Sequence, residues 1–157
     1  MLEGHEKTLL AAQGYTELGM FDEGLAELDT LPEKVGRDPK VIELRLGILM
    51  HARRWKNALA ISRQLTRACP DKNIGCIHTA FCLHELGKTD EARTVLLTGP
   101  ETLHKEPTYH YNLACYECHL GNMELARVHL DRSFQLDKKF RDFAKTDPDL
   151  EALRQKD

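Results

Sequence analysis

The sequence predicts an all-α protein, a right-handed α-solenoid of stacked helical hairpins, from three observations about spacing. One motif returns every 34 residues, and its central position is held in turn by Gly19, Arg53, Gly87 and Gly121. Apolar residues precede this position at intervals of three and four, which is the spacing of one helix face. A small residue stands five positions later in every copy, so a second helix can approach the first closely. A period of this length is the signature of repeated helical hairpins.

The copy between residues 109 and 130 shows the parts of the unit most clearly. Leu113, Tyr116 and Leu120 are spaced by three and four, and therefore share one face of a first helix. Gly121 then ends this helix, because glycine tolerates the left-handed conformation that a helix end often needs. A second helix follows the turn.

This unit resembles the tetratricopeptide repeat (TPR), which joins an apolar–small pair, a turn glycine, and an alanine with a large residue four positions later. Here the pattern is met at Leu113-Ala114, Gly121, Ala126 and Leu130. The resemblance implies one TPR-like domain over residues 1–157. The expected boundaries are about 2–31, 39–69, 73–99 and 107–137 for four repeats, and 138–157 for a C-terminal capping helix. Arg53 replaces the turn glycine of repeat two, which is tolerated if the turn is not left-handed at that residue.

Prolines divide the chain into two similar halves. Pro32 and Pro100 lie 68 residues apart, and each ends the second helix of its repeat early. Repeats one and three should therefore have short second helices followed by long loops, PEKVGR and PETLHKE. Asp38 before Pro39 predicts an N-cap and first helical residue for repeat two.

The C-terminal residues read as a cap. Asp147-Pro148 predicts the start of a last helix, and Leu150 and Leu153 give that helix one apolar face. A solenoid needs such an amphipathic end to cover the open face of its last repeat.

Composition limits the classes of function. Hydrophobic residues are 41% and charged residues 30%, which is ordinary for a soluble globular chain. No apolar run is long enough to cross a membrane, and the N-terminus does not resemble a secretory signal, so we expect a cytoplasmic protein that does not bind membranes. Five cysteines, an odd number, suit reduced thiols in that compartment. The net charge of −3 argues against nucleic-acid binding.

Charge is unevenly distributed along the chain. Residues 1–33 carry one basic residue against eight acidic ones, a net charge of −7, whereas residues 34–72 carry ten basic against three acidic ones, a net charge of +7. One interpretation is that neighbouring helices expose these charges and attract one another across the repeat junction. The other is that the acidic end docks on a basic patch of a second molecule, giving weak head-to-tail self-association.

By analogy with the family, the first helix of each hairpin faces a concave surface that binds a protein or peptide. The residues that the resemblance places on this surface are Glu43, Gly47, Met50, His51, Ile77, His78, Phe81, His84, Glu85, Tyr111, Asn112, Cys115, Cys118 and His119. Family members that clamp a terminal carboxylate use Lys, Arg and Asn from this face, and only Asn112, with Lys40 at the margin, matches here. We therefore expect a non-catalytic protein-binding module that needs no cofactor, or, more narrowly, a small secretion-type TPR chaperone.

A second hypothesis rests on Cys115, Cys118 and His119. Their C-x-x-C-H spacing matches a haem attachment pattern, but the motif lies inside a predicted repeat helix. The same three side chains share a helix face, and thiolate and imidazole suit zinc, with His84 or His78 as a further ligand from the neighbouring helix. A metal- or redox-responsive protein is thus the alternative to peptide binding. The sequence contains no phosphate-binding loop, nucleophile elbow or H-E-x-x-H motif, so we expect no enzymatic activity.

Overall fold

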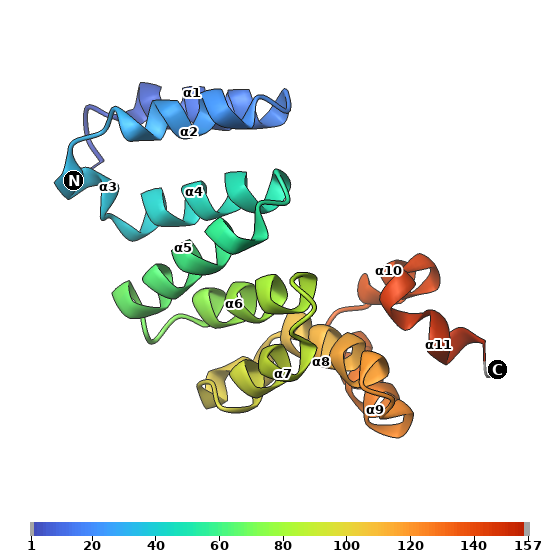
Figure 1. Cartoon of the computed structure of the whole chain (residues 1–157). Helices are drawn as coiled ribbons and strands as arrows, with labels where there is room; N and C mark the ends of the chain where they lie inside the picture. The colour runs from blue at the N-terminus through green and yellow to red at the C-terminus, as the bar shows by residue number, and fades with distance from the viewer. Residues whose placement is uncertain (1, 156–157) are drawn as a thin grey trace. The chain divides into compact units, whose positions relative to one another are not determined.

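A computed structural model describes residues 2–155, and over that range the regular structure is helical (Figure 1). The helices follow one another in pairs: α1 (Glu6–Glu17) with α2 (Phe21–Asp29), α4 (Pro39–His51) with α5 (Trp55–Ala68), α6 (Asn73–Glu85) with α7 (Thr89–Leu97), and α8 (Pro107–His119) with α9 (Met123–Leu136). The predicted all-α fold of four TPR-like hairpins is therefore confirmed. No described helix combines the length and the apolar character that crossing a bilayer requires.

The second helices alternate in length as the prolines predict. Helices α2 and α7 have 9 residues each, whereas α5 and α9 have 14. Asp38 caps α4 by accepting a hydrogen bond from the backbone N–H of Lys40 at 2.9 Å, as expected from the Asp38-Pro39 pair.

All four hairpins turn in the same way. In each turn, the residue after the central position donates its backbone N–H to the carbonyl five residues earlier: Met20 to Tyr15 (2.8 Å), Arg54 to Leu49 (2.9 Å), Lys88 to Leu83 (2.9 Å) and Asn122 to Glu117 (2.8 Å). A hydrogen bond of this kind is typical of a helix that is followed by one residue in the left-handed conformation. The central glycines accordingly have φ between 74° and 84°, and Arg53 has φ of 56°. The sequence allowed Arg53 to fit without strain if its turn were not left-handed. The turn is left-handed at Arg53, so this condition is not met.

The two expected long loops each contain one helical turn. Helix α3 (Glu33–Gly36) lies in the first and the 3-10 helix η1 (Glu101–Lys105) in the second. Each turn buries one apolar side chain, Val35 and Leu103, and these two residues are also 68 positions apart. An apolar anchor draws each connection onto the neighbouring helices, so the sequence-based description of both as plain loops is wrong.

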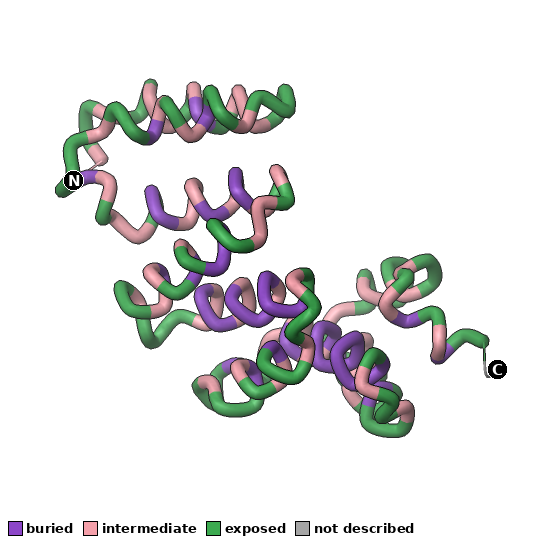
Figure 2. Tube along the Cα trace, viewed as in Figure 1, coloured by how far each residue is buried: buried purple, intermediate pink, exposed green. Residues whose placement is uncertain are grey.

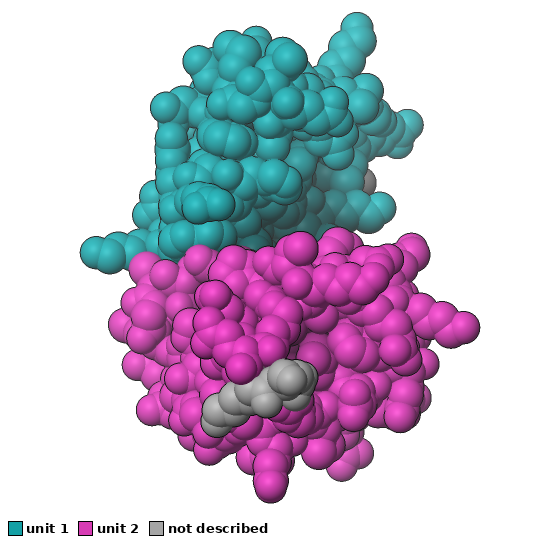
Figure 3. All heavy atoms as spheres, turned by 90° about the vertical axis from the view of Figure 1, so that its right-hand side faces the viewer, with its two compact units in different colours: residues 1–75 teal, residues 76–157 magenta. Residues whose placement is uncertain are grey.

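The chain divides into two compact units, residues 1–75 and 76–157 (Figure 3), with the boundary inside α6. Each unit is described by itself, and the single domain expected over residues 1–157 stays a prediction. The core of unit 1 consists of Ala12, Leu28, Val35, Val41 and Ile48. Partly buried apolar residues of α1, α2 and α4 pack against it.

Unit 1 also pairs its acidic and basic stretches. Asp22 on α2 accepts from Arg54 at 2.7 Å, and Asp29 accepts from Arg45 on α4 at 2.9 Å. The hydrogen bond from Arg54 lowers the pKa of the Asp22 carboxyl. These pairs confirm that neighbouring hairpins attract one another across the junction. Because the partners are largely exposed, the pairs contribute little to stability.

In unit 2, α8 is the most deeply buried helix that the structure describes (Figure 2). Residues 111–118 are all buried, because α9, α7 and η1 pack against α8 together with the C-terminal tail. The C-terminal tail, called the tail below, consists of residues 138–155. It contains α10 (Phe140–Thr146), the 3-10 helix η2 (Pro148–Leu150) and α11 (Glu151–Arg154). Leu150 and Leu153 of the tail are buried, as expected of a cap.

Candidate functional site

The residues predicted to line a binding surface differ in their exposure. On α4 of unit 1, Glu43, Gly47 and Met50 are half-buried and His51 is exposed. His51 is held by a 2.7 Å hydrogen bond between its Nδ1 and the carbonyl of Gly47. The deeply buried residues of α4 lie elsewhere on the helix, so this part of the predicted surface remains open to solvent.

The predicted residues of α6 are partly exposed. Ile77, His78 and Phe81 are half-buried and Glu85 is exposed, whereas His84 is buried. The α6 part of the surface therefore keeps its apolar members accessible, except around His84.

On α8 the predicted residues are covered. Tyr111, Asn112, Cys115 and Cys118 are buried, and only His119 is exposed. The tail covers Tyr111, Cys115 and Cys118. The Tyr111 hydroxyl donates to Asp147 Oδ2 at 2.6 Å, and its ring centre lies 5.0 Å from that of Phe140. Burial, together with this bond, raises the pKa of Tyr111. A ligand could reach these α8 residues only if the tail moved away.

The two cysteines of the C-x-x-C-H motif are not poised as ligands. Burial, and the nearby Asp147 and Asp149 carboxylates, raise the pKa of the Cys115 thiol far above its ordinary value. Burial also raises the pKa of Cys118. Haem attachment and zinc binding use the thiolate form, which both surroundings disfavour. The motif is best described as part of the packing between α8 and the tail.

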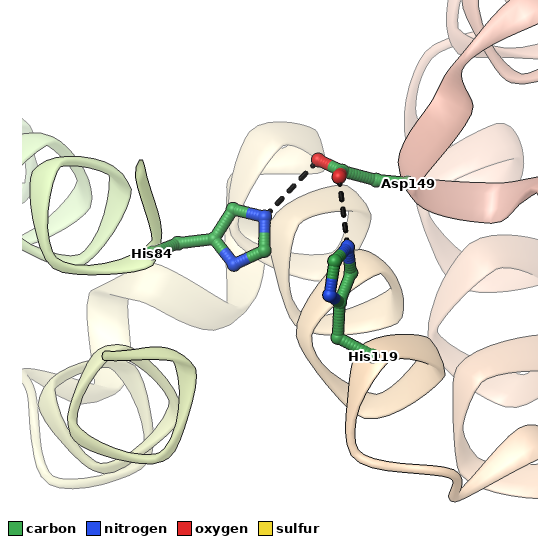
Figure 4. A group of neighbouring side chains, drawn as sticks. All are labelled: His84, His119 and Asp149. Carbon is green, nitrogen blue, oxygen red and sulfur yellow. Dashed lines mark hydrogen bonds and ion pairs between the residues drawn. The ribbon is translucent and has the colours of Figure 1, made fainter. Parts of the chain in front are cut away.

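A different group of side chains comes together at this place: His84, His119 and Asp149 (Figure 4). His84 projects from the end of α6, His119 from the last turn of α8, and Asp149 from η2. His84 Nε2 lies 3.2 Å from Asp149 Oδ2, and His119 Nε2 lies 2.9 Å from Asp149 Oδ1. One carboxylate thus bridges two imidazoles, and it joins the tail to two hairpins.

Charge and hydrogen bonding favour an ionised Asp149. The hydrogen bond from His84 is the main cause that lowers the pKa of this carboxyl, and the bond from His119 adds to it, while burial opposes both. The other nitrogen of His84, Nδ1, lies 2.9 Å from the hydroxyl of Thr89 on α7. The centres of the two imidazole rings are 4.7 Å apart, and the ring planes are nearly perpendicular.

The second feature of unit 2 is a cleft between α9 and the tail, which we call the tail cleft. Its volume is about 770 Å³. Its lining residues are Arg127, Leu130, Asp131, Phe134, Lys138, Arg141, Asp142, Ala144, Lys145, Leu150, Leu153 and Arg154. Among these described residues, five are cationic and two are acidic. The cleft therefore has an apolar interior and a predominantly positive rim.

Sequence reasoning missed both features. It placed His84 and His119 on the predicted surface but assigned no site role to Asp149, because Asp147-Pro148-Asp149 reads locally as a helix start. That local reading is correct, since Asp147 Oδ1 accepts the backbone N–H of Asp149 at 3.0 Å. The 34-residue period assigns Leu130 only to the packing of its hairpin, and the lining residues from Lys138 onward lie beyond repeat four, where the period gives no guidance.

The repeated hairpins, their left-handed turns and the covering tail define an all-α, TPR-like repeat protein. Solved structures of MamA share this fold. MamA residues 41 to the end from Desulfovibrio magneticus RS-1 matches with a TM-score of 0.71 at 14% identity, covering 85% of this chain and 75% of that chain. The structure "MamA MSR-1 C2" matches with a TM-score of 0.69 at 20% identity, covering 84% and 76%. No protein-family model and no curated protein matches the sequence.

Proposed function

We propose that this chain is a non-catalytic, cytoplasmic binding protein that holds an acidic, amphipathic segment of another protein in the tail cleft. The observation that carries the proposal is the pairing of an apolar interior with a cationic rim in one cleft. The fold supports it by analogy, because helical-hairpin repeats commonly present surfaces to protein ligands. A groove of this kind accepts the apolar face of an amphipathic helix.

The chemistry of the cleft gives each group a role. Leu130 and Phe134 are half-buried and offer apolar surface that a ligand's own apolar side chains would cover. The guanidinium of Arg141 lies 5.2 Å from the centre of the Phe134 ring, which holds a cation directly above the apolar interior. Cations at a rim mainly speed association and select for acidic ligands. The binding should therefore weaken as salt is added.

The open residues of α4 and those of α6 remain part of the proposal as protein contacts, each within its own unit. Met50 and His51 belong to unit 1, and Phe81 and Glu85 belong to unit 2. The covered residues of α8 are left out, because the tail occupies that face. The hypothesis of a cysteine-based metal or redox site is also left out, because both thiols are buried and their surroundings raise their pKa.

Fluorescence anisotropy tests the tail cleft. The probe is a labelled synthetic helix with leucines on one face and glutamates on the other, and the comparison is the same peptide with lysines in place of the glutamates. We expect only the acidic peptide to bind, and the double variant Lys138→Glu/Arg141→Glu to weaken its binding by about tenfold or more. Equal binding of the two peptides would overturn the proposal.

A matched control separates the cleft from general attraction between charges. Arg63→Glu/Arg67→Glu makes the same charge change at exposed residues of α5 in unit 1. This variant should keep most of the affinity for the acidic peptide. If it loses as much affinity as the cleft variant, the attraction is nonspecific and the cleft is not the site.

A second candidate partner is another copy of this chain. The net charge of −7 over residues 1–33 complements a positive rim, as head-to-tail association requires. Some of these acids are already paired within unit 1, and others, such as Glu23, are exposed.

A further inference from the structure

We propose that His84, His119 and Asp149 form a binding site for a divalent transition-metal ion of the zinc type. Two imidazoles and one carboxylate make a donor set that zinc accepts in proteins, usually with water at a fourth position. The three residues come from α6, α8 and η2, so an ion here would join the tail to two hairpins. The inference does not depend on the tail cleft or on its ligand.

The geometry is close to what an ion needs. The three donor atoms all lie within 4.8 Å of one another. With zinc–ligand distances of about 2.0–2.2 Å, the edges of a tetrahedral site measure about 3.3–3.5 Å. The two nitrogen–oxygen separations, 3.2 Å to Oδ2 and 2.9 Å to Oδ1, involve different oxygens of Asp149, so only one of them is an edge when Asp149 supplies a single oxygen. Small shifts of the side chains, with a rotation of the carboxylate, would bring one oxygen and both nitrogens around an ion in place of the protons that now bond to Asp149.

Neighbouring groups hold two of the ligands in orientation. Thr89 Oγ1 is hydrogen-bonded to Nδ1 of His84 and leaves Nε2 directed at Asp149. Metal-bound histidines usually have such a hydrogen-bond partner on the nitrogen that does not bind the metal. The backbone of Asp149 is fixed because its N–H bonds Asp147 Oδ1. Asp147 is held in turn by the hydroxyl of Tyr111. These supports limit the rearrangement that binding would require.

The site is shielded on one side and open on the other. The His84 side chain is 6% exposed, whereas that of His119 is 45% exposed. A hollow of about 340 Å³ opens beside His119 and Asp149, and its other described lining residues are Cys118, Pro148, Glu151, Ala152 and Gln155. An ion can enter from this hollow, and water can fill the fourth position there. Bound metal would then favour the state in which the tail covers α8.

The test uses the full chain without a histidine tag, treated with chelator and then titrated with zinc chloride by calorimetry. We expect one ion per chain, with binding weakened by at least about tenfold in Asp149→Asn and in His119→Gln. Because His119 is exposed, its variant keeps the experiment decisive if Asp149→Asn fails to fold. Zinc should also raise the melting temperature of the native chain and leave that of His119→Gln unchanged.

The matched control is Glu151→Gln, which removes an exposed carboxylate beside the same hollow but retains all three proposed ligands and their supports. It should bind zinc within about threefold of the native chain. Equal losses in Glu151→Gln and Asp149→Asn, or no more zinc on the native chain than on His84→Gln/His119→Gln, would show that the cluster is only a hydrogen-bonded clamp. Cobalt chloride gives an independent readout: a thiolate-to-cobalt charge-transfer band would mean that Cys118 is the ligand, and would overturn the assignment.

Discussion

Arg53 has a left-handed backbone conformation, and the equivalent position in each of the other three repeats is a glycine. Its φ of 56° lies in the left-handed region, where a side chain crowds the following carbonyl. The turn keeps the hydrogen bond from Arg54 to Leu49 that the glycine turns also make. The repeat geometry therefore dictates the conformation here, and the local residue adapts to it at some cost in stability.

Arg53→Gly should stabilise the protein. Relief of the left-handed strain is worth about 1–2 kcal/mol, and the extra flexibility of glycine in the unfolded chain offsets part of it, which leaves a gain of roughly 0.5–1 kcal/mol. Urea unfolding would measure it. The reciprocal variant Gly87→Arg should lose stability at the equivalent turn. A loss in Arg53→Gly would show that the arginine side chain makes a contact that outweighs the strain.

His110 and His129 form a pair of stacked imidazoles in unit 2, with ring centres 5.9 Å apart. Burial lowers the pKa of both, and Arg132 and His104 lower that of His110 further. The bond between His110 Nε2 and the carbonyl of His104, and the charge of Glu117 near His129, act in the opposite direction. Both rings therefore stay neutral in the folded chain at a pH where unfolded histidines are charged.

The free energy of unfolding should consequently fall as the pH drops below about 6.5, the ordinary histidine value, towards the lowered folded pKa values. The sign follows because the unfolded chain binds more protons than the folded one in this interval. Urea unfolding between pH 7.5 and 5 would measure the slope. His110→Gln/His129→Gln should flatten it relative to the native chain. An unchanged slope in the double variant would contradict the assignment.

Among the elements, α8 is enclosed because the tail covers it in addition to the neighbouring helices. Tyr111 and His119 bond Asp147 and Asp149, and Cys115 and Cys118 lie beneath the same segment. A short tail segment held mainly by Leu150, Leu153 and a few polar bonds can open locally without unfolding the rest. The rate at which a reagent modifies the α8 thiols would report that opening.

Leu150→Ala should speed the modification of Cys115 and Cys118 by a thiol reagent. Removing a fully buried leucine side chain costs about 2–5 kcal/mol, so the open state should become more populated by about tenfold or more. Mass spectrometry of labelled peptides would give the rate at each cysteine. Leu28→Ala removes an equally buried leucine from unit 1 and serves as the control. If both variants speed labelling equally, the tail does not open separately.

At the scale of the whole molecule, the 34-residue and 68-residue spacings were enough to predict the hairpins and their alternating lengths. The capping role of Leu150 and Leu153 followed instead from their own spacing after Asp147-Pro148. The apolar pair Val35 and Leu103 also obeys the longer spacing, so the buried turns in the two loops could have been found from the sequence. The His–Asp cluster could not. Asp149 lies outside the repeats, and its bonds to His84 and His119 span 65 and 30 residues.

The acidic residues 1–33 and the positive rim of the tail cleft make self-association testable for the whole chain. If the acidic residues 1–33 of one copy occupy the tail cleft of another, light scattering at low salt should show a mass that rises with protein concentration and falls to the monomer at high salt. Lys138→Glu/Arg141→Glu should remain monomeric throughout. A native chain that stays monomeric at low salt and high concentration would exclude this partner.

The covering of α8 by the tail decides how an engineer could lengthen this protein. A fifth hairpin appended after α9 would have to displace the segment that seals α8, and would have to cover Tyr111 and the two thiols in its place. Duplicating residues 39–106 in place avoids this, because that 68-residue block starts at Pro39 and stops just before its counterpart Pro107. The longer array would keep its alternation of short and long helices, and its original ending.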